Sequence, residues 1–525
     1  MNRILSKTAV ICFLMSTALY GGGLLPVNVA VENSVVSIKD GYEPQWLAGK
    51  EAKIELASAM GEYESVQLII EANEDVEISE AGINDFKSGL FKKISSANIQ
   101  LRTLENVGGF DDALVPFRTL SLKANERKVL WFTVKIPHTA AAGNYKTNIV
   151  LYGTKGRLSI PVMLRVHKFR LPITPSIPAL FGISDNMFKI RYGTVIDSDE
   201  FKVMADQWYQ FVLDYRISPY LCRWVNDSMQ HHAYPCPWEV GTPQCEKYLA
   251  DQRLAAFAVP YHNLDTEAFR KTIKYLEDNN FMDKGYFYLY DEPSKSAQYE
   301  QIKTWAKEIH SIVPQGRVLT TFYCGLTDGP FKDDLYAVPE LLGDSTQILC
   351  MSIWAAGGEE ANVEKIKSKI LPNQQWWSYV CCGPGSPQPN LLMEMTGFQN
   401  RAVMWRVWKE GGKGFLYWAV NSFDFDGSDG KGSPIRIRSG LPAGDGVLVY
   451  PGDMFGVDGV VASVRLERWR DGAEDYEYLK AYQDKLGRDA ALIALQPVYQ
   501  GPTQYTDDEQ NIEKMRRQIL TTVSR

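Results

Sequence analysis

The sequence contains none of the short motifs that mark common phosphate-binding, serine-hydrolase or zinc-protease sites. It has no glycine-rich phosphate loop, no serine nucleophile elbow and no zincin helix. Positive charge is also scarce: 56 Lys and Arg against 63 Asp and Glu give a formal net charge of −7. An acidic chain is a poor match for nucleic acid or an anionic membrane, so we expect neither as the main partner.

Long hydrophobic runs are missing beyond the N-terminus. No later stretch approaches the roughly 18 uninterrupted apolar residues of a membrane-spanning candidate. The N-terminal run at 8–19 is too short to span and follows two cations, a pattern typical of an export signal. Small residues at 18–23 and at 28–30 offer two cleavage positions, and we take residues 1–30 as the signal peptide. We therefore expect an exported protein (periplasmic, cell-surface or secreted) without stable membrane insertion.

Cysteine is too sparse for a disulfide framework. Of eight Cys, one lies in the N-terminal segment, so an odd number remains and at least one thiol is free or pairs between chains. Cys236 and Cys245 are close enough in sequence to form a disulfide. With Cys222, His231 and His232 they also form a rival constellation of metal-ligand types. Their spacing matches no standard zinc pattern, so we expect a disulfide or a plain loop there, and no metal or cofactor.

At 525 residues the chain is too long for one compact core. Residues 31–172 contain short apolar strands separated by Gly and Asn turns, which predicts an N-terminal all-β sandwich. Three prolines within 171–178 indicate an interdomain linker.

From residue 173 the rhythm changes to strand, loop and helix. Strand-like runs fall at about 179–183, 217–222, 253–259, 285–290, 317–323, 347–353, 375–380 and 414–418. Helical patterns fall at 198–213, 265–278, 294–313, 360–370, 396–409 and 465–484, whereas 223–250 shows none. Strands that alternate with helices predict an α/β domain over 173–525, a (β/α)8 TIM-like barrel with a C-terminal helical end.

The most informative stretch is the fourth of these strands. It ends in two adjacent carboxylates, Asp291 and Glu292, just before a helical pattern. Active sites of α/β barrels are built at this carboxyl edge, and two neighbouring carboxylates can divide acid and ionised roles between them. The alternative is that the acids only complement the dipole of the following helix.

Aromatic residues make up 12% of the chain, and several follow the same edge of the predicted barrel. One such Trp is most often a core residue, but four successive strands that end in Trp or Tyr favour a sugar-binding pocket. The substrate we expect is therefore a glycan or glycoconjugate. The candidate binding residues are Tyr323, Trp354, Trp377, Tyr379, Trp418 and Asn421.

The seventh strand lacks the acid that a conventional glycosidase would carry. Most glycosidases place two carboxylates roughly 5–5.5 Å or 6.5–9.5 Å apart, and adjacent strand residues point to opposite faces. Residues 380–385 (VCCGPG) supply no second one. This favours a 2-acetamido sugar that uses its own acetamido oxygen as nucleophile. One carboxylate then holds the acetamido N–H and the other protonates the leaving oxygen, provided that the strand end bends so that both face the pocket.

Two other readings stay open. Asp424, Asp426 or Glu359 could contribute a second carboxylate from a loop, which would give a conventional glycosidase. The chain could also be a non-catalytic carbohydrate-binding protein on a decayed barrel.

Six segments carry a family likeness: 61–67 (GEYESVQ), 289–293 (LYDEP), 375–379 (QWWSY), 414–418 (GFLYW), 446–451 (GVLVYP) and 463–478 (SVRLERWRDGAEDYEY). With them the chain resembles glycoside hydrolase family 123, the β-N-acetylgalactosaminidase-like proteins. The resemblance implies a β-sandwich followed by a (β/α)8 barrel, and retaining, substrate-assisted cleavage of β-linked N-acetylgalactosamine.

The resemblance also assigns residues. It implies that Asp291 orients the acetamido group and that Glu292 is the general acid/base, with Trp354, Trp377, Tyr379 and Trp418 lining the sugar pocket. We interpret the run at 470–475 as structural, because its spacing suits ion pairs and hydrogen bonds at the start of a helix.

Overall fold

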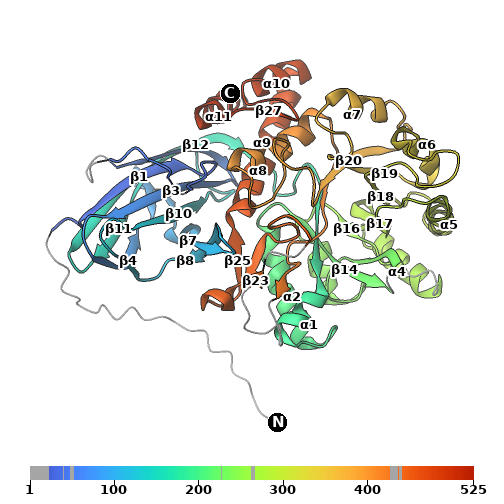
Figure 1. The fold of residues 1–525 in the computed structure, drawn as a ribbon, viewed down its shortest axis with the longest axis horizontal. Helices are drawn as coiled ribbons and strands as arrows, with labels where there is room; N and C mark the ends of the chain where they lie inside the picture. The colour runs from blue at the N-terminus through green and yellow to red at the C-terminus, as the bar shows by residue number, and fades with distance from the viewer. Residues whose placement is uncertain are drawn as a thin grey trace, which may run out of the picture.

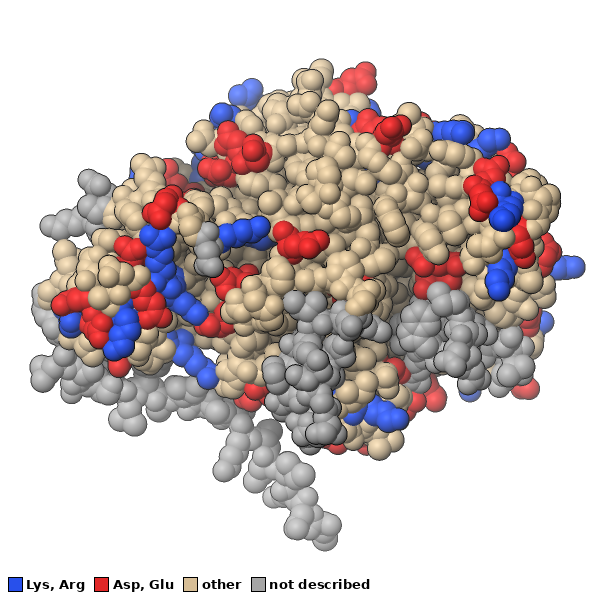
Figure 2. Space-filling model, in the orientation of Figure 1, with Lys and Arg blue, Asp and Glu red and all other residues tan. Residues whose placement is uncertain are grey.

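The computed structural model describes residues 23–39, 41–47, 52–225, 228–261, 266–425, 435–436 and 440–525. Figure 1 shows a strand-rich half (blue) and an α/β half (green to yellow), with the C-terminal helices (orange to red) at and above their junction. Acidic and basic side chains are interspersed in small groups over the face drawn in Figure 2. Among the described helices, none is both long and apolar enough to cross a bilayer.

The strand-rich half contains two antiparallel-dominated sheets. Buried and more accessible residues alternate along β12, so the strand turns one face toward a core: Leu158, Ile160 and Val162 are buried, and the residues between them are exposed. The first sheet has the order β1 (Val27–Asn33), β3 (Tyr63–Ala72), β10 (Arg127–Lys135), β7 (Ile99–Val107), β8 (Phe110–Pro116), β25 (Val460–Ser463) and β24 (Val449–Pro451). The second has the order β2 (Ile54–Met60), β12 (Gly156–Arg170), β11 (Gly143–Gly153), β4 (Val76–Ile83) and β9 (Leu120–Leu122), with β5 (Phe86–Ser88) and β6 (Lys92–Ile94) beside β11.

This half extends beyond the predicted range 31–172 at both ends. Strands β24 and β25 come from the C-terminal part of the chain, and β25 pairs with β8 through Ala462 and Leu114. A pairing across about 350 residues leaves no local signal in the sequence.

The first strand also begins before residue 31. β1 pairs with β3 from Val27 to Asn33, and Val29 and Ala30 are fully buried. Cleavage after Ala30 would therefore remove half of a core strand, whereas cleavage near 18–23 would keep it whole.

A chain that starts at Gly23 should consequently be more stable than one that starts at Val31. The shorter chain loses the buried side chains of Leu25, Val27 and Val29, each of which contributes about 1.5–3 kcal/mol when fully buried. We expect a clear drop in the urea midpoint of the shorter chain. Equal midpoints would contradict the pairing of β1.

The α/β half is built on a nine-stranded sheet that curls into a nearly closed barrel. The predicted strands are all present: β13 (Ala179–Ser184), β14 (Ser218–Val225), β16 (Phe257–Ala258), β17 (Gly285–Tyr290), β18 (Val318–Phe322), β19 (Ile348–Ser352), β20 (Gln375–Val380) and β21 (Phe415–Tyr417). The ninth, β15 (Ser228–Tyr234), is an addition that runs antiparallel to β14 and β17 and lies between them. A hairpin thus replaces the expected second strand–helix unit.

Helices cover this barrel between its strands. The predicted helical ranges correspond to α2 (Asp199–Leu213), α4 (Thr266–Asp278), α5 (Ser296–Ile312), α7 (Glu360–Lys367), α8 (Gly397–Lys409) and α9 (Val464–Leu486). The structure adds α1 (Asp185–Tyr192), α3 (Pro243–Leu249), α6 (Val338–Leu342), α10 (Arg488–Leu495) and α11 (Glu509–Val523), and two small hairpins, β22 (Asp424–Phe425) with β23 (Ile435–Arg436) and β26 (Tyr499–Gly501) with β27 (Gln504–Tyr505). The expectation that 223–250 holds no helix is wrong, because α3 lies there. This helix is only two turns long, which is too short to produce a helical period in the sequence.

Helix α9 joins the two halves through buried charges. The 470–475 run lies in the middle of this helix and not at its start. Arg401 of α8 donates to Asp475 at 2.7 and 2.9 Å, and Glu467 accepts from Arg102 of the sandwich at 2.9 Å. Burial alone would raise the pKa of Glu467, but Arg102 and Arg470 lower it to about 2. Through these ion pairs, α9 holds the barrel and the sandwich together.

Candidate active site

The acid pair sits at an irregular strand end. The register of β17 against β18 shifts between Tyr288 and Tyr290, directly before Asp291. Glu292 then has φ +48°, in the left-handed region that residues other than glycine seldom adopt. A bulge and a left-handed residue both re-aim the side chains that follow. This is the bend that an adjacent pair of acids needs in order to face one side.

Hydrogen bonds show that both carboxylates do face the barrel interior. Tyr288 and Tyr379 belong to the cluster of inward side chains inside the barrel. The hydroxyl of Tyr288 donates to Asp291 Oδ1 at 2.7 Å, and the hydroxyl of Tyr379 donates to Glu292 Oε1. Asp291 and Glu292 are themselves half-buried, so the pair is held from inside the barrel and is partly accessible to solvent.

Thr321 of β18 connects the two acids. Its hydroxyl donates to Asp291 Oδ1 at 2.9 Å and accepts the backbone N–H of Glu292 at 3.0 Å. The side chain is 1% exposed and lies 3.3 Å from the Tyr288 hydroxyl. One buried hydroxyl thus holds the position of one carboxylate and the backbone turn of the other.

The two tyrosines are fixed as donors. Burial, and after it the charge of Glu292, raises the pKa of Tyr379 well above its usual range. Burial and the charge of Asp291 do the same for the pKa of Tyr288. Both hydroxyls therefore keep their protons at neutral pH.

Two of the predicted aromatic residues stand at the rim. Trp354, after β19, is 52% exposed and packs its ring against Gly383 at the end of β20, where a Cβ would come within 2.9 Å of the indole. Tyr323, after β18, is 41% exposed and lies near Glu292. The pKa of Tyr323 is raised first by the nearby Cys324, then by burial, and then by the charge of Glu292. Exposed rings beside a carboxylate pair suit the apolar face of a sugar.

Trp418 is held by an aspartate that sequence reasoning missed. Its indole N–H donates to Asp445 Oδ1 at 2.9 Å, and its ring covers Gly446, where a Cβ would approach to 2.3 Å. Asp445 is buried, in a turn after residue 440. The nearby glycines at 444 and 446, both with positive φ, were the available signal for this turn.

Trp377 and Asn421 are placed differently. Trp377 is 1% exposed, packs on Gly414 and donates its indole N–H to Gln375 at the start of β20. Asn421 is also buried: its side-chain oxygen accepts the Ser184 N–H at 2.8 Å and its nitrogen donates to the Ser184 oxygen at 3.1 Å. Trp377 thus packs below Tyr379, and Asn421 ties the end of β13 to the segment after β21.

Of the alternative carboxylates, only the side chain of Glu359 belongs to the described residues. Glu359 is exposed at the start of α7. Asp426 and the side chain of Asp424 lie outside the described residues, as do the side chains of Cys222, His231 and His232.

Of the two expectations for Cys236 and Cys245, a disulfide or a plain loop, the disulfide is not formed. Both side chains are buried thiols, and burial together with a hydrogen bond to Cys245 raises the pKa of Cys236. Within the described part of the chain, no three His, Cys, Asp or Glu side chains gather as a metal site would require.

Comparisons with known proteins concern the family and the fold. The family model "Glycoside hydrolase 123, catalytic domain" matches residues 200–482. Among solved structures, a family 123 glycoside hydrolase from Clostridium perfringens superposes with a TM-score of 0.66 at 12% identity, over 95% of this chain and 98% of that one. An endo-beta-1,4-mannanase from Thermotoga petrophila reaches a TM-score of only 0.31 at 12% identity, over 58% and 77% of the two chains. A search of curated proteins found no match.

Proposed function

Because the chain belongs to glycoside hydrolase family 123, we propose that it is a retaining glycosidase that cleaves β-linked 2-acetamido sugars by substrate assistance. The observation that carries the proposal is the pair Asp291 and Glu292, which are adjacent in sequence yet held by two different tyrosines. Such an arrangement suits two carboxylates with unequal tasks.

Asp291 would hold the nucleophile of the substrate. Its Oδ1 already accepts two hydrogen bonds, from Tyr288 and Thr321, which orient the carboxylate. The acetamido N–H would donate to this carboxylate while the acetamido oxygen attacks the anomeric carbon and the glycosidic C–O bond breaks. The negative charge of Asp291 would stabilise the positive oxazolinium ring that forms.

Glu292 would move the proton. In the first step its carboxylic acid protonates the leaving oxygen. In the second its carboxylate takes a proton from the water that opens the oxazoline, so the configuration at the anomeric carbon is retained. The hydroxyl of Tyr379 would keep Glu292 Oε1 in place in both steps.

The rim would supply the sugar contacts. Tyr323 is exposed near Glu292, Trp354 is exposed after the end of β19, and Trp418 is oriented by Asp445. Because Trp377 and Asn421 are buried, we assign neither of them a contact with the sugar. The resemblance to family 123 favours N-acetylgalactosamine, and the Clostridium perfringens enzyme is described as hydrolysing glycolipid glycans, which supports a glycoconjugate substrate here.

Export is part of the proposal. The basic and apolar start of the chain supports it, and the position of β1 favours cleavage in the 18–23 region.

The test is an assay of the purified protein on 4-nitrophenyl N-acetyl-β-galactosaminide and N-acetyl-β-glucosaminide. We expect turnover, faster on the galactosaminide, and competitive inhibition by a thiazoline analogue of the oxazoline. A folded protein that turns over neither substrate contradicts the proposal. Turnover without thiazoline inhibition would instead favour a carboxylate nucleophile from a loop, such as Glu359.

A further inference from the structure

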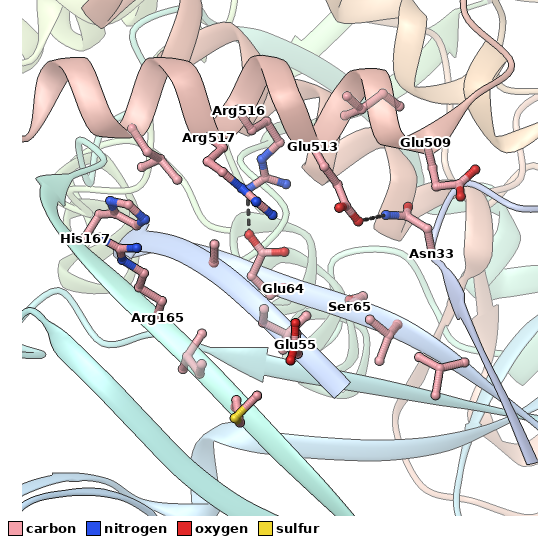
Figure 3. A pocket seen from close by; sticks show the side chains of 18 of the residues that line it. Asn33, Glu55, Glu64, Ser65, Arg165, His167, Glu509, Glu513, Arg516 and Arg517 are labelled. Atoms are coloured by element: carbon pink, nitrogen blue, oxygen red, sulfur yellow. Dashed lines mark hydrogen bonds and ion pairs between the residues drawn. The ribbon is translucent and has the colours of Figure 1, made fainter. Parts of the chain in front are cut away.

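A cavity of about 590 Å³ lies in the strand-rich half, where it shares no residue with the acid pair. Its walls come from β1 and β3 of one sheet, β2, β11 and β12 of the other, and α11, which covers the opening between the sheet edges (Figure 3). Ligand pockets typically occupy about 300–1,000 Å³, so the space is sufficient for a monosaccharide with solvent.

One end of the cavity is cationic. His167 and Arg165 project from β12 at the left of Figure 3, and Arg517 reaches into the cavity from α11, beside Arg516. His167 is 7% exposed, whereas both arginines are exposed. Within the described residues, none of these three side chains has a hydrogen-bond or ion-pair partner. Burial, then the two arginines, lower the pKa of His167, so its imidazole is neutral at pH 7 and the guanidinium charges remain uncompensated.

The arginine in the middle of the cavity is already paired. Arg516 donates to Glu64 at 2.5 Å and also to Glu62. A ligand anion would therefore be drawn to the end with Arg165 and Arg517 and not to Arg516.

The other end offers hydrogen-bond acceptors. Asn33 donates to Glu513 at 3.4 Å, and Glu509 lies in the same wall, on the opposite side of Figure 3 from His167. Glu513 is exposed and Glu509 half-buried, so neither carboxylate needs a counter-cation. Carboxylates of this kind readily accept hydrogen bonds from hydroxyl groups.

We propose that this cavity is a binding site for an acidic sugar, a monosaccharide unit that carries one carboxylate. The carboxylate would bind between Arg165 and Arg517, whose planar guanidinium groups match it, with the imidazole of His167 as a further donor. The sugar hydroxyls would bind at Asn33, Glu509 and Glu513. The site stands on its own residues and does not depend on the proposed catalytic reaction.

The test is a calorimetric titration of the full chain with glucuronate and with N-acetylneuraminate, beside glucose and inorganic sulfate. We expect at least one acidic sugar to bind, and the double variant Arg165→Ala/Arg517→Ala to bind it at least tenfold more weakly. Arg157→Ala is the matched control, because Arg157 is exposed on the same strand but lies outside the cavity. Its affinity should equal that of the unaltered protein, and Asp291→Asn should leave binding unchanged, which separates this site from the acid pair.

Three results would overturn the proposal. Glucose that binds as tightly as the acidic sugars would remove the role of the carboxylate. Sulfate that binds as tightly as the acidic sugars would show that the cavity binds anions without recognising the sugar. An affinity unchanged in the double variant, with thermal unfolding also unchanged, would place the ligand elsewhere.

Discussion

Replacing Glu292 by Gln is expected to lower kcat/KM on 4-nitrophenyl N-acetyl-β-galactosaminide by about 10²–10⁴, the range for loss of a general acid/base. Replacing Asp291 by Asn should cause a loss of similar size for a different reason, because an amide can no longer stabilise the positive charge of the oxazolinium ring. Both residues are half-buried and need no rearrangement to accommodate the isosteric amide, so both variants should fold.

The leaving group separates the two roles. A 2,4-dinitrophenolate leaves without a proton, so the first step catalysed by Glu292→Gln should recover substantially on a dinitrophenyl substrate. The loss in Asp291→Asn should be nearly the same for both aryl groups, because Asp291 acts on the acetamido group. The measurement is the ratio of kcat/KM values on the two substrates for each variant.

Matched controls are available in the same part of the chain. Asp283→Asn and Glu300→Gln make the same chemical changes at exposed positions, before β17 and on α5 respectively. They should leave activity unchanged. A dinitrophenyl substrate that rescues Asp291→Asn but not Glu292→Gln would show that the two roles are exchanged.

The sequence was sufficient to locate the acid pair because the signal there is local. An aromatic strand that runs directly into Asp291, Glu292 and a proline fixes the strand end within one residue. The left-handed φ of Glu292 was not predictable in the same way, since no glycine or asparagine marks the position. Only the chemistry of an adjacent acid pair, in which both carboxylates must face the substrate, calls for such a bend.

The aromatic residues around the acid pair were only partly predictable, because an aromatic side chain near a strand end can point toward the acid pair or into the barrel core. Trp377 and Tyr379 are two residues apart and share the inner face of β20, yet one packs in the core and the other reaches Glu292. Asp445 was missed for the opposite reason. It comes from a turn after β21. This turn is brought back beside Trp418 by the bridge between Asn421 and Val447, a pairing that no local pattern marks.

Thr321 is the residue whose importance only the three-dimensional arrangement reveals, and Thr321→Val is expected to lower kcat/KM by about 10- to 100-fold. Valine has the same shape but donates nothing to Asp291 and accepts nothing from the Glu292 N–H. A hydrogen bond to a charged group is worth about 1.5–3 kcal/mol, and each 1.36 kcal/mol corresponds to about tenfold in rate.

Two further variants make this prediction specific. Thr321→Ser keeps the hydroxyl and should retain most of the activity, which separates the hydrogen bonds from the packing of the methyl group. Tyr288→Phe removes a donor to Asp291 and none to Glu292, so its loss should be independent of the leaving group. The loss in Thr321→Val should be larger and should shrink partially on a dinitrophenyl substrate, because the turn that aims Glu292 is released as well. If Thr321→Val and Tyr288→Phe show identical losses on both substrates, Thr321 supports Asp291 alone, and the turn at Glu292 is held by the bulge of β17 and the interior packing behind it.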